Sequence, residues 1–504
     1  MKIAGLDIGT TGCKLTVFSE SGEYLGKAYR DYPVYRGSAH EIDAGKILDA
    51  VLAVIREMAE KHPDIGGIGV TSFGESFVLA GDGEDPLLPT MLYTDPRGAE
   101  EVRELEEKIG SGEIARITGL RAHEMYSLPK LMWVKKHLPD VWKQVKHIFL
   151  IEDYVVWLLT GTAQIDYSLA TRTQAFDISK LEFSQEILDA AGIPAELFSK
   201  PVPTGTSAGP VKPEVAEKTG LGTDTIVVSV SHDQVAAAVG AGAFDASVAV
   251  DGAGTVECLT PIFDSLPDPD VMYNGYFSVV PYVIPGTYVA YAFSYTGGAL
   301  IQWCSETLAG KEAELAKARG ISVNEFLEEQ YADMQESGRR EKDVPTGLLV
   351  LPHFAGAATP YMDTGSKGAI LGLTMDTTVA DLYRACLEGV VYEMMVNAEA
   401  LKGSGVKFER LNATGGGARS ALWMQMKANA LNVPITALKT ADAGTVGSAM
   451  LTGVAAGVFK DLGDAAAHMV EEVKTYYPDA GRNAAFRKVF ERYKKIYAAV
   501  RPLT

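Results

Sequence analysis

Cysteine is scarce in this chain of 504 residues, which contains only Cys13, Cys258, Cys304 and Cys386. These four residues lie far apart in the sequence and form no C-x-x-C pair. Their spacing argues against a zinc site, a thioredoxin-like motif and the disulfide framework of a small secreted protein. We therefore expect the cysteines to be reduced.

Basic residues are also few. The chain has 46 lysines and arginines against 65 aspartates and glutamates, which gives a formal net charge of −19. A field of this sign repels phosphate backbones, so no nucleic-acid partner is expected. It also disfavours an anionic substrate, and any phosphate site must be built locally from backbone N–H groups.

Residues 271–304 lack any charge, but they do not read as a membrane span. Pro281 and Pro285 interrupt the segment and its aromatic residues alternate, a pattern typical of two or three buried strands. The acidic Asp7 comes too early for a signal peptide. The sequence predicts a soluble cytoplasmic protein with no membrane partner.

The common nucleotide-binding motifs are absent. The chain has neither G-x-x-x-x-G-K-[ST] nor a full G-x-G-x-x-G, but it has three turns rich in glycine or threonine, at residues 7–12, 252–255 and 415–417. Glycine lets successive N–H groups approach an anion, and a hydroxyl adds a donor. Each turn alone could be an ordinary turn. Together they favour an ATP site divided between two parts of the chain.

The opening of the chain predicts an α/β fold. Strands are expected at residues 2–6, 14–19 and 24–29, followed by an amphipathic helix at 43–61 and a buried strand at 65–71. The first residue of that helical segment, an aspartate, is a plausible cap.

A second strand–turn–strand unit follows at residues 247–260. We interpret it as the start of a second, similar half, with a boundary near residue 250, although chance could also produce the recurrence. Residues 201–213 are rich in proline and glycine and are expected to form an irregular connector before a strand at 225–230. Residues 100–160 are expected to be mostly helical, and later helices are expected near residues 300–308, 323–336, 379–401, 420–431 and 483–500.

Two aspartates are placed where phosphate chemistry needs carboxylates. Asp7 follows a buried strand and could hold Mg²⁺ through water while the turn holds phosphate, or it could only order its own turn. Asp233 lies between a buried strand and a segment that reads as a helix. It could cap that helix, or it could accept the proton of an attacking hydroxyl in phosphoryl transfer.

Two polar runs could bind an uncharged polyol: Phe73-Gly74-Glu75-Ser76 and Tyr93-Thr94-Asp95-Pro96-Arg97. Carboxylates and arginines hydrogen-bond sugar hydroxyls, and an aromatic ring packs against the C–H face. Asp95 and Arg97 could equally form a salt bridge at a turn, which their local pattern favours. His40-Glu41 is a similar run but has a more exposed pattern.

These clusters, in this order, resemble the FGGY family of carbohydrate kinases, whose members phosphorylate glycerol, xylulose, ribulose and gluconate. The resemblance runs from Ile3 to about Gly457. Its most specific part is residues 368–373 together with 381–389, where Cys386 replaces a more usual small or aliphatic residue. The adenosine motif of the family is matched by residues 415–420 and 423–429, where Asn429 replaces the usual aspartate.

The resemblance implies two actin-like, ribonuclease H-like domains with a cleft between them. Residues 1–250 would hold the sugar and the catalytic base, and residues 251–504 the nucleotide. It implies ATP and Mg²⁺ as cofactors, with Asp233 as the base and Asp7 at Mg²⁺. It implies sugar contacts from Glu75, Tyr93, Asp95, Arg97 and Gln234, and nucleotide contacts from Gly9, Thr10, Thr11, Gly12, Gly254, Thr255, Gly298, Gln302, Gly416 and Gly417. It also allows a homodimer.

The resemblance leaves the substrate open. Xylulokinases carry Gln-Met-His-Gly where this chain has residues 73–76, with Glu75 at the histidine, and glycerol kinases have Arg-Glu where this chain has Gly74-Glu75. Glu257 could face the sugar or pair with a neighbour. The leading hypothesis is a kinase of a small neutral sugar, most simply a ketose such as xylulose, with glycerol or a longer polyol as the alternative. The rivals are a non-kinase ATPase switch of the actin/Hsp70 type and a degenerate sugar sensor.

Overall fold

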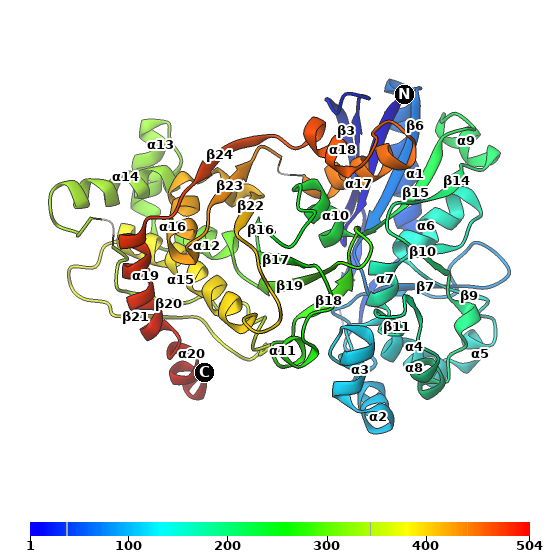
Figure 1. The fold of residues 1–504 in the computed structure, drawn as a ribbon, viewed down its shortest axis with the longest axis horizontal. Coiled ribbons are helices and arrows are strands. Elements are labelled where there is room, and N and C mark those ends of the chain that lie inside the picture. Colours follow the sequence, from blue (N-terminus) through cyan, green and yellow to red (C-terminus); the bar gives the residue numbers. More distant parts are fainter. Residues whose placement is uncertain (37–38, 343, 441) are drawn as a thin grey trace.

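The computed structural model describes residues 1–36, 39–342, 344–440 and 442–504, and within them two large mixed sheets form the centres of two lobes (Figure 1). In spatial order the first sheet contains β14 (Thr206–Pro210), β15 (Ile226–His232), β6 (Ile65–Ser72), β1 (Lys2–Ile8), β2 (Gly12–Phe18) and β3 (Tyr24–Asp31). The second contains β18 (Ser278–Pro281), β19 (Tyr288–Ser294), β17 (Glu257–Phe263), β16 (Val248–Ala253), β22 (Arg410–Thr414), β23 (Ile435–Leu438) and β24 (Glu472–Tyr476).

The two sheets share one topology. Each begins with an antiparallel meander, β1-β2-β3 in the first and β16-β17-β19 in the second. Parallel strands are then added beside the first strand, β6 and β15 in one sheet and β22 and β23 in the other. An antiparallel strand, β14 or β24, completes that side. The α/β fold and the two similar halves expected from the sequence are confirmed.

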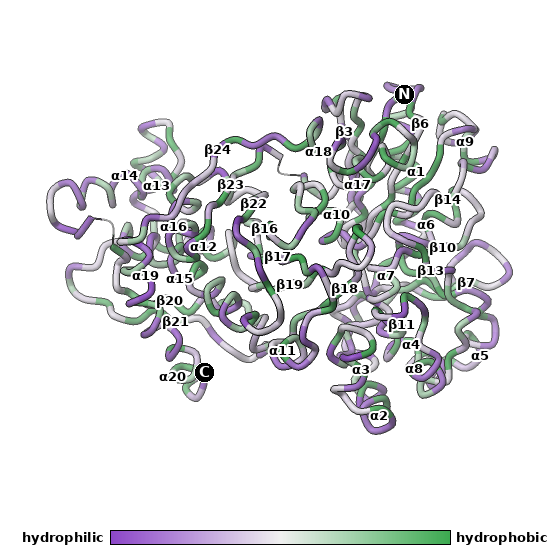
Figure 2. Tube along the Cα trace, viewed as in Figure 1, coloured by the Kyte–Doolittle hydropathy of each residue, from purple (hydrophilic) through white to green (hydrophobic). Residues whose placement is uncertain are grey.

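Helices cover both sheets. Those of the first half are α1 (Ala44–Lys61), α2 (Ala99–Ile109), α3 (Ser111–Thr118), α4 (Ser127–His137), α5 (Pro139–Trp142), α6 (Ile151–Thr160), α7 (Tyr167–Arg172), α8 (Gln185–Ala191), α9 (Pro213–Thr219) and α10 (Asp233–Gly240). Those of the second half are α11 (Pro269–Asn274), α12 (Gly298–Leu308), α13 (Gly310–Arg319), α14 (Val323–Glu336), α15 (Val379–Ala400), α16 (Ala421–Leu431), α17 (Ala443–Ala455), α18 (Leu462–Met469), α19 (Ala480–Tyr493) and α20 (Ile496–Val500). Polar residues are prominent on the outer helices α13 and α14 (Figure 2).

The first helix forms for the reason expected from the sequence. Asp43 is its N-cap, and one of its carboxylate oxygens accepts a hydrogen bond from the backbone N–H of Gly45 at 2.8 Å. The apolar residues of α1, among them Ile47, Val51 and Val54, are buried against the first sheet. Capping and burial together therefore fix the start and the orientation of this helix.

Three expectations need correction. Residues 206–210 are not part of an irregular connector but form β14, because proline and glycine are tolerated on the edge strand of a sheet. Residues 271–304 contain two of the expected strands, β18 and β19, but begin and end in α11 and α12. The last helical segment is divided into α19 and α20.

Helix α17 belongs to the second half in sequence but packs on the first sheet, where Figure 1 shows it among the elements of that lobe. Small residues permit this contact. A Cβ on Gly5 of β1 would collide with the carbonyl oxygen of Thr445, and the hydroxyl of Ser448 donates to the carbonyl of Gly69 at 2.8 Å. The helix also crosses α10 at Gly240 and Gly447. Backbone contact between these elements therefore joins the two halves.

This crossing predicts the effect of adding a methyl group. In Gly447→Ala the new Cβ would collide with the carbonyl oxygen of Ala236. We therefore expect the free energy of unfolding to fall by about 1–3 kcal/mol. Gly112→Ala in α3 is the control, because a Cβ there meets nothing within 4 Å and helix propensity improves. Thermal unfolding followed by circular dichroism measures both. Equal stability of the two variants would contradict the close crossing.

Candidate active site

Three parallel strands of the first sheet end side by side. Ile8 of β1 is aligned with Ser72 of β6, and Ser72 is aligned with His232 of β15. The carboxyl ends of these strands therefore share one edge, which is the usual place for ligands in open α/β sheets. Asp7, Glu75 and Asp233 come together there, and both other carboxylates raise the pKa of Asp233.

Asp233 is the first residue of α10, and His232 occupies the N-cap position, so the alternative that Asp233 caps the helix is wrong. Its side chain is 33% exposed, but Oδ1 is buried, has no hydrogen-bond partner among the described residues and lies 3.2 Å from Nε2 of His232. Burial, followed by the charges of Asp7 and Glu75, raises the pKa of Asp233 to about 7. The result is a reachable carboxyl group that changes charge near neutral pH.

His232 itself is uncharged at neutral pH. Burial and the positive charge of Arg172 lower its pKa well below the ordinary range. Its backbone N–H donates to the hydroxyl of Ser168 in α7 at 2.9 Å, and its Nδ1 lies 3.4 Å from the hydroxyl of Tyr291 in β19. This residue therefore contacts both halves of the molecule beside Asp233.

Asp7 lies against the first turn. Burial raises its pKa, Lys14 lowers it and Asp442 raises it again. Nζ of Lys14 donates to Asp442 at 2.8 Å, so this lysine makes an ion pair between β2 and the start of α17. Asp7 is thus a carboxylate only partly compensated by one nearby cation.

Glu75 is bound to an arginine that is distant in sequence. Arg172 at the end of α7 donates from Nε to Oε1 of Glu75 at 2.5 Å, and its Nη2 bonds the same oxygen. Burial opposes the charge on Arg172, but Glu75 and the surrounding tyrosines raise its pKa, so it stays protonated. Glu75 has a φ of 64°, and the hydroxyl of Ser127 holds its carbonyl at 2.7 Å. A left-handed conformation in a non-glycine residue is a feature concentrated at functional sites.

Asp95 and Arg97 form the salt bridge that their local pattern favoured. Nε of Arg97 donates to Oδ1 of Asp95 at 2.7 Å and Nη2 donates to Oδ2 at 2.8 Å, while the backbone N–H of His40 also bonds Oδ2 at 2.8 Å. Nη2 of Arg97 further reaches Glu41 at 2.6 Å. Burial raises the pKa of Asp95, but these bonds outweigh it and lower the pKa overall. The 40–41 and 93–97 runs therefore form one cluster.

Two other expected sugar contacts are accessible. Tyr93 is exposed. It lies near Tyr295, which follows β19 in the second half. The pKa of Tyr295 is raised mainly by its own burial and further by Tyr93. Gln234 is exposed in the first turn of α10, and its backbone N–H lowers the pKa of Asp233.

The first glycine turn is closed by its own backbone. The N–H of Gly9 donates to the carbonyl of Gly12 at 2.9 Å, and the hydroxyl of Tyr32 donates to the carbonyl of Gly9. Thr10 is partly exposed and Thr11 is exposed. Their hydroxyl and N–H groups are therefore available to a ligand.

The second and third turns lie together in the second half. The N–H of Gly298 donates to the carbonyl of Gly254 at 2.8 Å, and that of Gly297 donates to Thr255 at 2.9 Å. Gly415 has a φ of 86°, and a Cβ there would lie 2.6 Å from the carbonyl oxygen of Ala253. Glycine is required because the turn after β22 touches the β16–β17 hairpin.

The remaining nucleotide candidates border these turns. Gly416 is exposed and Gly417 is partly exposed, with Trp423 where a Cβ would project from Gly417. Gln302 is exposed on α12 and donates to Glu306 at 2.8 Å. Residues 254, 255 and 298 are thus joined by backbone hydrogen bonds. The turn that contains Gly416 and Gly417 lies against the same hairpin at Ala253.

Glu257 does not stand alone after the second turn. It shares Nζ of Lys427 with Asp251, at 2.5 Å from Glu257 and 2.8 Å from Asp251, and all three side chains are almost completely buried. Burial raises the pKa of Glu257 well above its usual range, Asp251 adds to this and Lys427 opposes it. The pairing alternative for Glu257 therefore holds, and the cluster ties α16 to the β16–β17 hairpin.

Comparison with known proteins gives this arrangement a family. Models of the N-terminal and C-terminal domains of the FGGY family of carbohydrate kinases match residues 2–240 and 253–456. The chain belongs to the FGGY family of carbohydrate kinases.

The names of similar FGGY proteins point to two different substrates. A xylulose kinase of Lactococcus lactis is 26% identical over 98% of this chain and 96% of its own, and a gluconokinase of Bacillus subtilis is 27% identical over 94% and 91%. The crystal structure of a xylulose kinase from Rhodospirillum rubrum matches with a TM-score of 0.88 at 25% identity, covering 100% of this chain and 99% of that one. This protein is accordingly a sugar kinase.

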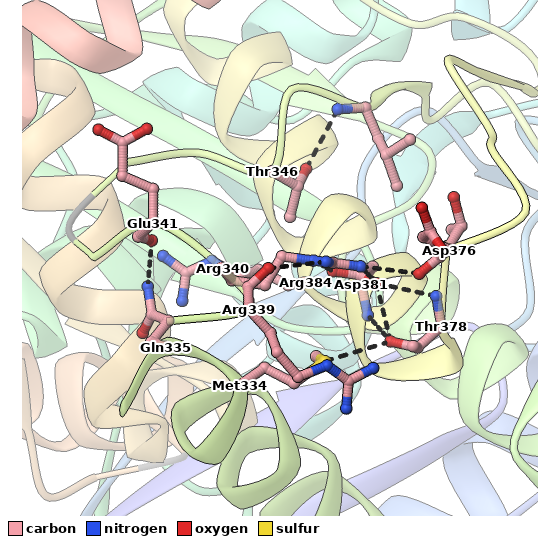
Figure 3. A network of polar contacts seen from close by, with 12 residues as sticks. Met334, Gln335, Arg339, Arg340, Glu341, Thr346, Asp376, Thr378, Asp381 and Arg384 are labelled. Atoms are coloured by element: carbon pink, nitrogen blue, oxygen red, sulfur yellow. Dashed lines mark hydrogen bonds and ion pairs between the residues drawn. The ribbon is translucent and has the colours of Figure 1, made fainter. Parts of the chain in front are cut away.

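The most specific run of the FGGY resemblance has a structural role at the start of α15. Thr378 caps the helix by accepting from the N–H of Asp381 at 3.2 Å, and Arg340 clamps both oxygens of Asp381 at 2.7 Å (Figure 3). A Cβ on Gly389 would lie 2.5 Å from the carbonyl oxygen of Val350. Asn429 likewise binds within the protein, accepting from the N–H of Asp479 at 3.0 Å. These contacts lie within the second half of the molecule.

Sequence reasoning missed the buried cations of this kinase. Arg172 gave no local signal, because its partner Glu75 is 97 residues away. Lys130 lies in an apolar part of α4, near Asp95 and Glu75, and burial lowers its pKa to about 8. Lys427 lies in an equally apolar part of α16. A lysine within an apolar helical face needs a buried partner, which is the signal that could have identified both lysines.

No helix in the described ranges is long and apolar enough to cross a bilayer. Those ranges also contain no cluster of three or more histidine, cysteine or acidic side chains suited to a metal ion.

The Lys427 cluster predicts a large effect on stability. Lys427→Met leaves Asp251 and Glu257 buried without a cation, so we expect a loss of about 3–5 kcal/mol in unfolding free energy. Adding Asp251→Asn and Glu257→Gln should restore most of it. The control is Lys439→Met, which removes an exposed pair with Glu471 and should cost less than about 1 kcal/mol. Urea unfolding measures all three, and similar losses for Lys427→Met and Lys439→Met would contradict the role of the cluster.

Proposed function

We propose that this sugar kinase transfers the γ-phosphate of ATP to a terminal hydroxyl of a small neutral sugar, most simply a ketose such as xylulose. The observation that carries the proposal is the state of Asp233, a reachable carboxyl with a buried, unpartnered oxygen and a pKa raised to about 7. Its position at the strand edge beside Asp7 and Glu75 supports the same proposal. The similarity to xylulose kinases supports a ketose, and the local abundance of carboxylates disfavours gluconate.

Asp233 is proposed as the base. Phosphoryl transfer through a loose transition state needs mainly orientation and neutralisation of charge, and a carboxylate is sufficient to align the alcohol and accept its proton. A pKa near the operating pH favours general base catalysis because the group is both available and basic. The sugar hydroxyl is proposed to meet the exposed part of this carboxyl group, because Oδ1 itself is buried beside His232.

Nucleotide binding is proposed at the glycine turns. Thr10 and Thr11, with Gly9 and Gly12, would contact the terminal phosphates from the first half, and Gly254 and Thr255 from the second. Gly298, Gln302, Gly416 and Gly417 would line the rest of the nucleotide. The close backbone contacts at Gly298 and Gly415 fit this role, since a side chain at either position would fill space beside the turns.

Asp7 fits a magnesium site in its chemistry. Mg²⁺ in phosphate sites is held through one or two carboxylates, water and substrate phosphates, and Asp7 is a partly exposed carboxylate beside the first turn, with a pKa raised chiefly by desolvation. When bound, the ion would neutralise charge on the transferring phosphate. The part of Asp7 is to hold that charge at the end of β1.

The sugar is proposed to contact Glu75, Tyr93, Arg97 and Gln234. Tyr93 and Gln234 are both exposed, which supports contact with a ligand placed at Asp233. Both oxygens of Asp95 already accept hydrogen bonds, so its proposed part is to orient Arg97 against the sugar.

The proposal predicts sugar-dependent ADP release. In a coupled assay over ketopentoses, ketohexoses, glycerol, tetritols and gluconate, we expect turnover with at least one ketose. Asp233→Asn should remove that turnover while ATP still binds, because the amide cannot accept the proton. ATP hydrolysis at a rate independent of any sugar would contradict the proposal and favour an ATPase switch.

The pKa of Asp233 predicts the pH dependence of the reaction. Below about pH 7 the carboxyl is protonated and cannot act as a base, so kcat/KM for the sugar should rise with pH and level off above about pH 7. A steady-state pH profile measures the pH at which kcat/KM rises. A rise centred near pH 4 would show that burial and the neighbouring carboxylates do not raise the pKa of Asp233.

A further inference from the structure

The guanidinium of Arg172 has a donor that the protein does not use. Nε and Nη2 both bond Oε1 of Glu75, while Nη1 is buried and has no hydrogen-bond partner among the residues that the structure describes. The side chain is only 7% exposed. A buried polar group without a partner is unfavourable, and such groups in native proteins call for an explanation such as a ligand that completes them.

An acceptor close to this donor is also incomplete. Oδ1 of Asp233 is buried and unpartnered, and it lies 3.2 Å from Nε2 of His232. The same imidazole lies beside Arg172, because a Cβ built on Gly74 would be 3.1 Å from Cδ2 of His232 and 3.0 Å from Cγ of Arg172. The positive charge of Arg172 also lowers the pKa of both His232 and Asp233, so the unused donor and the unused acceptor lie near the same neutral ring.

Gly74 makes room for this arrangement. Any side chain at position 74 would press on Arg172 and His232. The aromatic rings of Tyr126 and Tyr291 lie 5.1 Å and 6.0 Å from Cζ of Arg172 and hold it from two sides. Because Tyr126 precedes α4 and Tyr291 is in β19, the guanidinium is held by both halves of the molecule.

The way in which Glu75 binds Arg172 limits what the guanidinium can recognise. The planar fork formed by Nε and Nη2, one of the two at which arginine can bind a carboxylate, is already occupied by Glu75, and Nη1 keeps its two N–H groups. The pair is electrically neutral and the adjacent groups, Asp233 and Asp7, are acidic. Beside these acidic groups, the N–H groups of Nη1 suit a hydroxyl or carbonyl oxygen, and the surrounding negative charge disfavours an acid.

We propose that Nη1 of Arg172 donates to an oxygen of the sugar adjacent to the hydroxyl that Asp233 deprotonates, and that the Arg172–Glu75 pair selects uncharged sugars over sugar acids. This inference rests on the sugar-kinase function proposed above. It makes Arg172 a residue that contacts the substrate and makes Glu75 the residue that sets the charge of the pair.

Calorimetric binding without ATP tests the contact, with D-xylulose, D-ribulose and D-gluconate as probes. We expect Arg172→Lys to weaken binding of the preferred ketose by about 10- to 100-fold, the loss of one hydrogen bond to a charged group, and to leave MgATP binding unchanged. The control is Arg340→Lys, which disturbs the clamp on Asp381 at the start of α15 and should leave sugar affinity unchanged. Wild-type ketose affinity in Arg172→Lys would overturn the inference.

Glu75→Gln tests the selectivity and remains informative if the arginine variant does not fold. The pair then carries a positive charge, so the affinity ratio of gluconate to ketose should rise by about tenfold or more. An unchanged ratio, or a wild-type enzyme that binds and phosphorylates gluconate in preference to ketoses, would overturn the inference and leave the kinase function standing. Sugar-independent ATP hydrolysis by the wild type would instead overturn the proposed function itself.

Discussion

Three carboxylates share one strand edge with a single buried arginine, and the properties of the site follow from this imbalance. The parallel register of β1, β6 and β15 forces Asp7, Glu75 and Asp233 to the same edge. Arg172 compensates Glu75 directly, and the remaining repulsion acts on Asp233 together with burial. An aspartate in water would be ionised at neutral pH, whereas this one is poised to change charge there. In the proposed mechanism this carboxyl group, and not a histidine, serves as the base.

The opposite side of the site depends on close backbone contact rather than on charge. Glycines at 298 and 415 let neighbouring turns of the second half touch, and the N–H groups of Gly254 and Gly298 are used in hydrogen bonds between and within those turns. This agrees with the net charge of −19, which leaves little general attraction for anions. The second half also reaches into the first, because α17 lies on the first sheet and Asp442 before it binds Lys14 beside Asp7.

Local features were the ones that the sequence predicted well. The cap at Asp43, the boundaries of α14 and the repeated strand–turn–strand unit all depend on neighbouring residues. Ion pairs across the chain could not be found in this way, since Arg172 meets Glu75 only when α7 packs beneath the end of β15. The misread β14 shows the same limit, because only the order of strands shows that residues 206–210 form an edge strand that tolerates proline.

The central claim is that crowded carboxylates and burial poise Asp233 as the base, and direct titration of its carboxyl group tests it. Carbon-13 NMR of protein labelled at the aspartate side-chain carboxyl, with the Asp233 signal assigned from its loss in Asp233→Asn, gives the pKa without any turnover. The structure predicts a pKa of about 7 in the wild type and a lower value in Glu75→Gln, which removes one of the charges that raise it. A pKa near 4 that does not respond to Glu75→Gln would contradict the account.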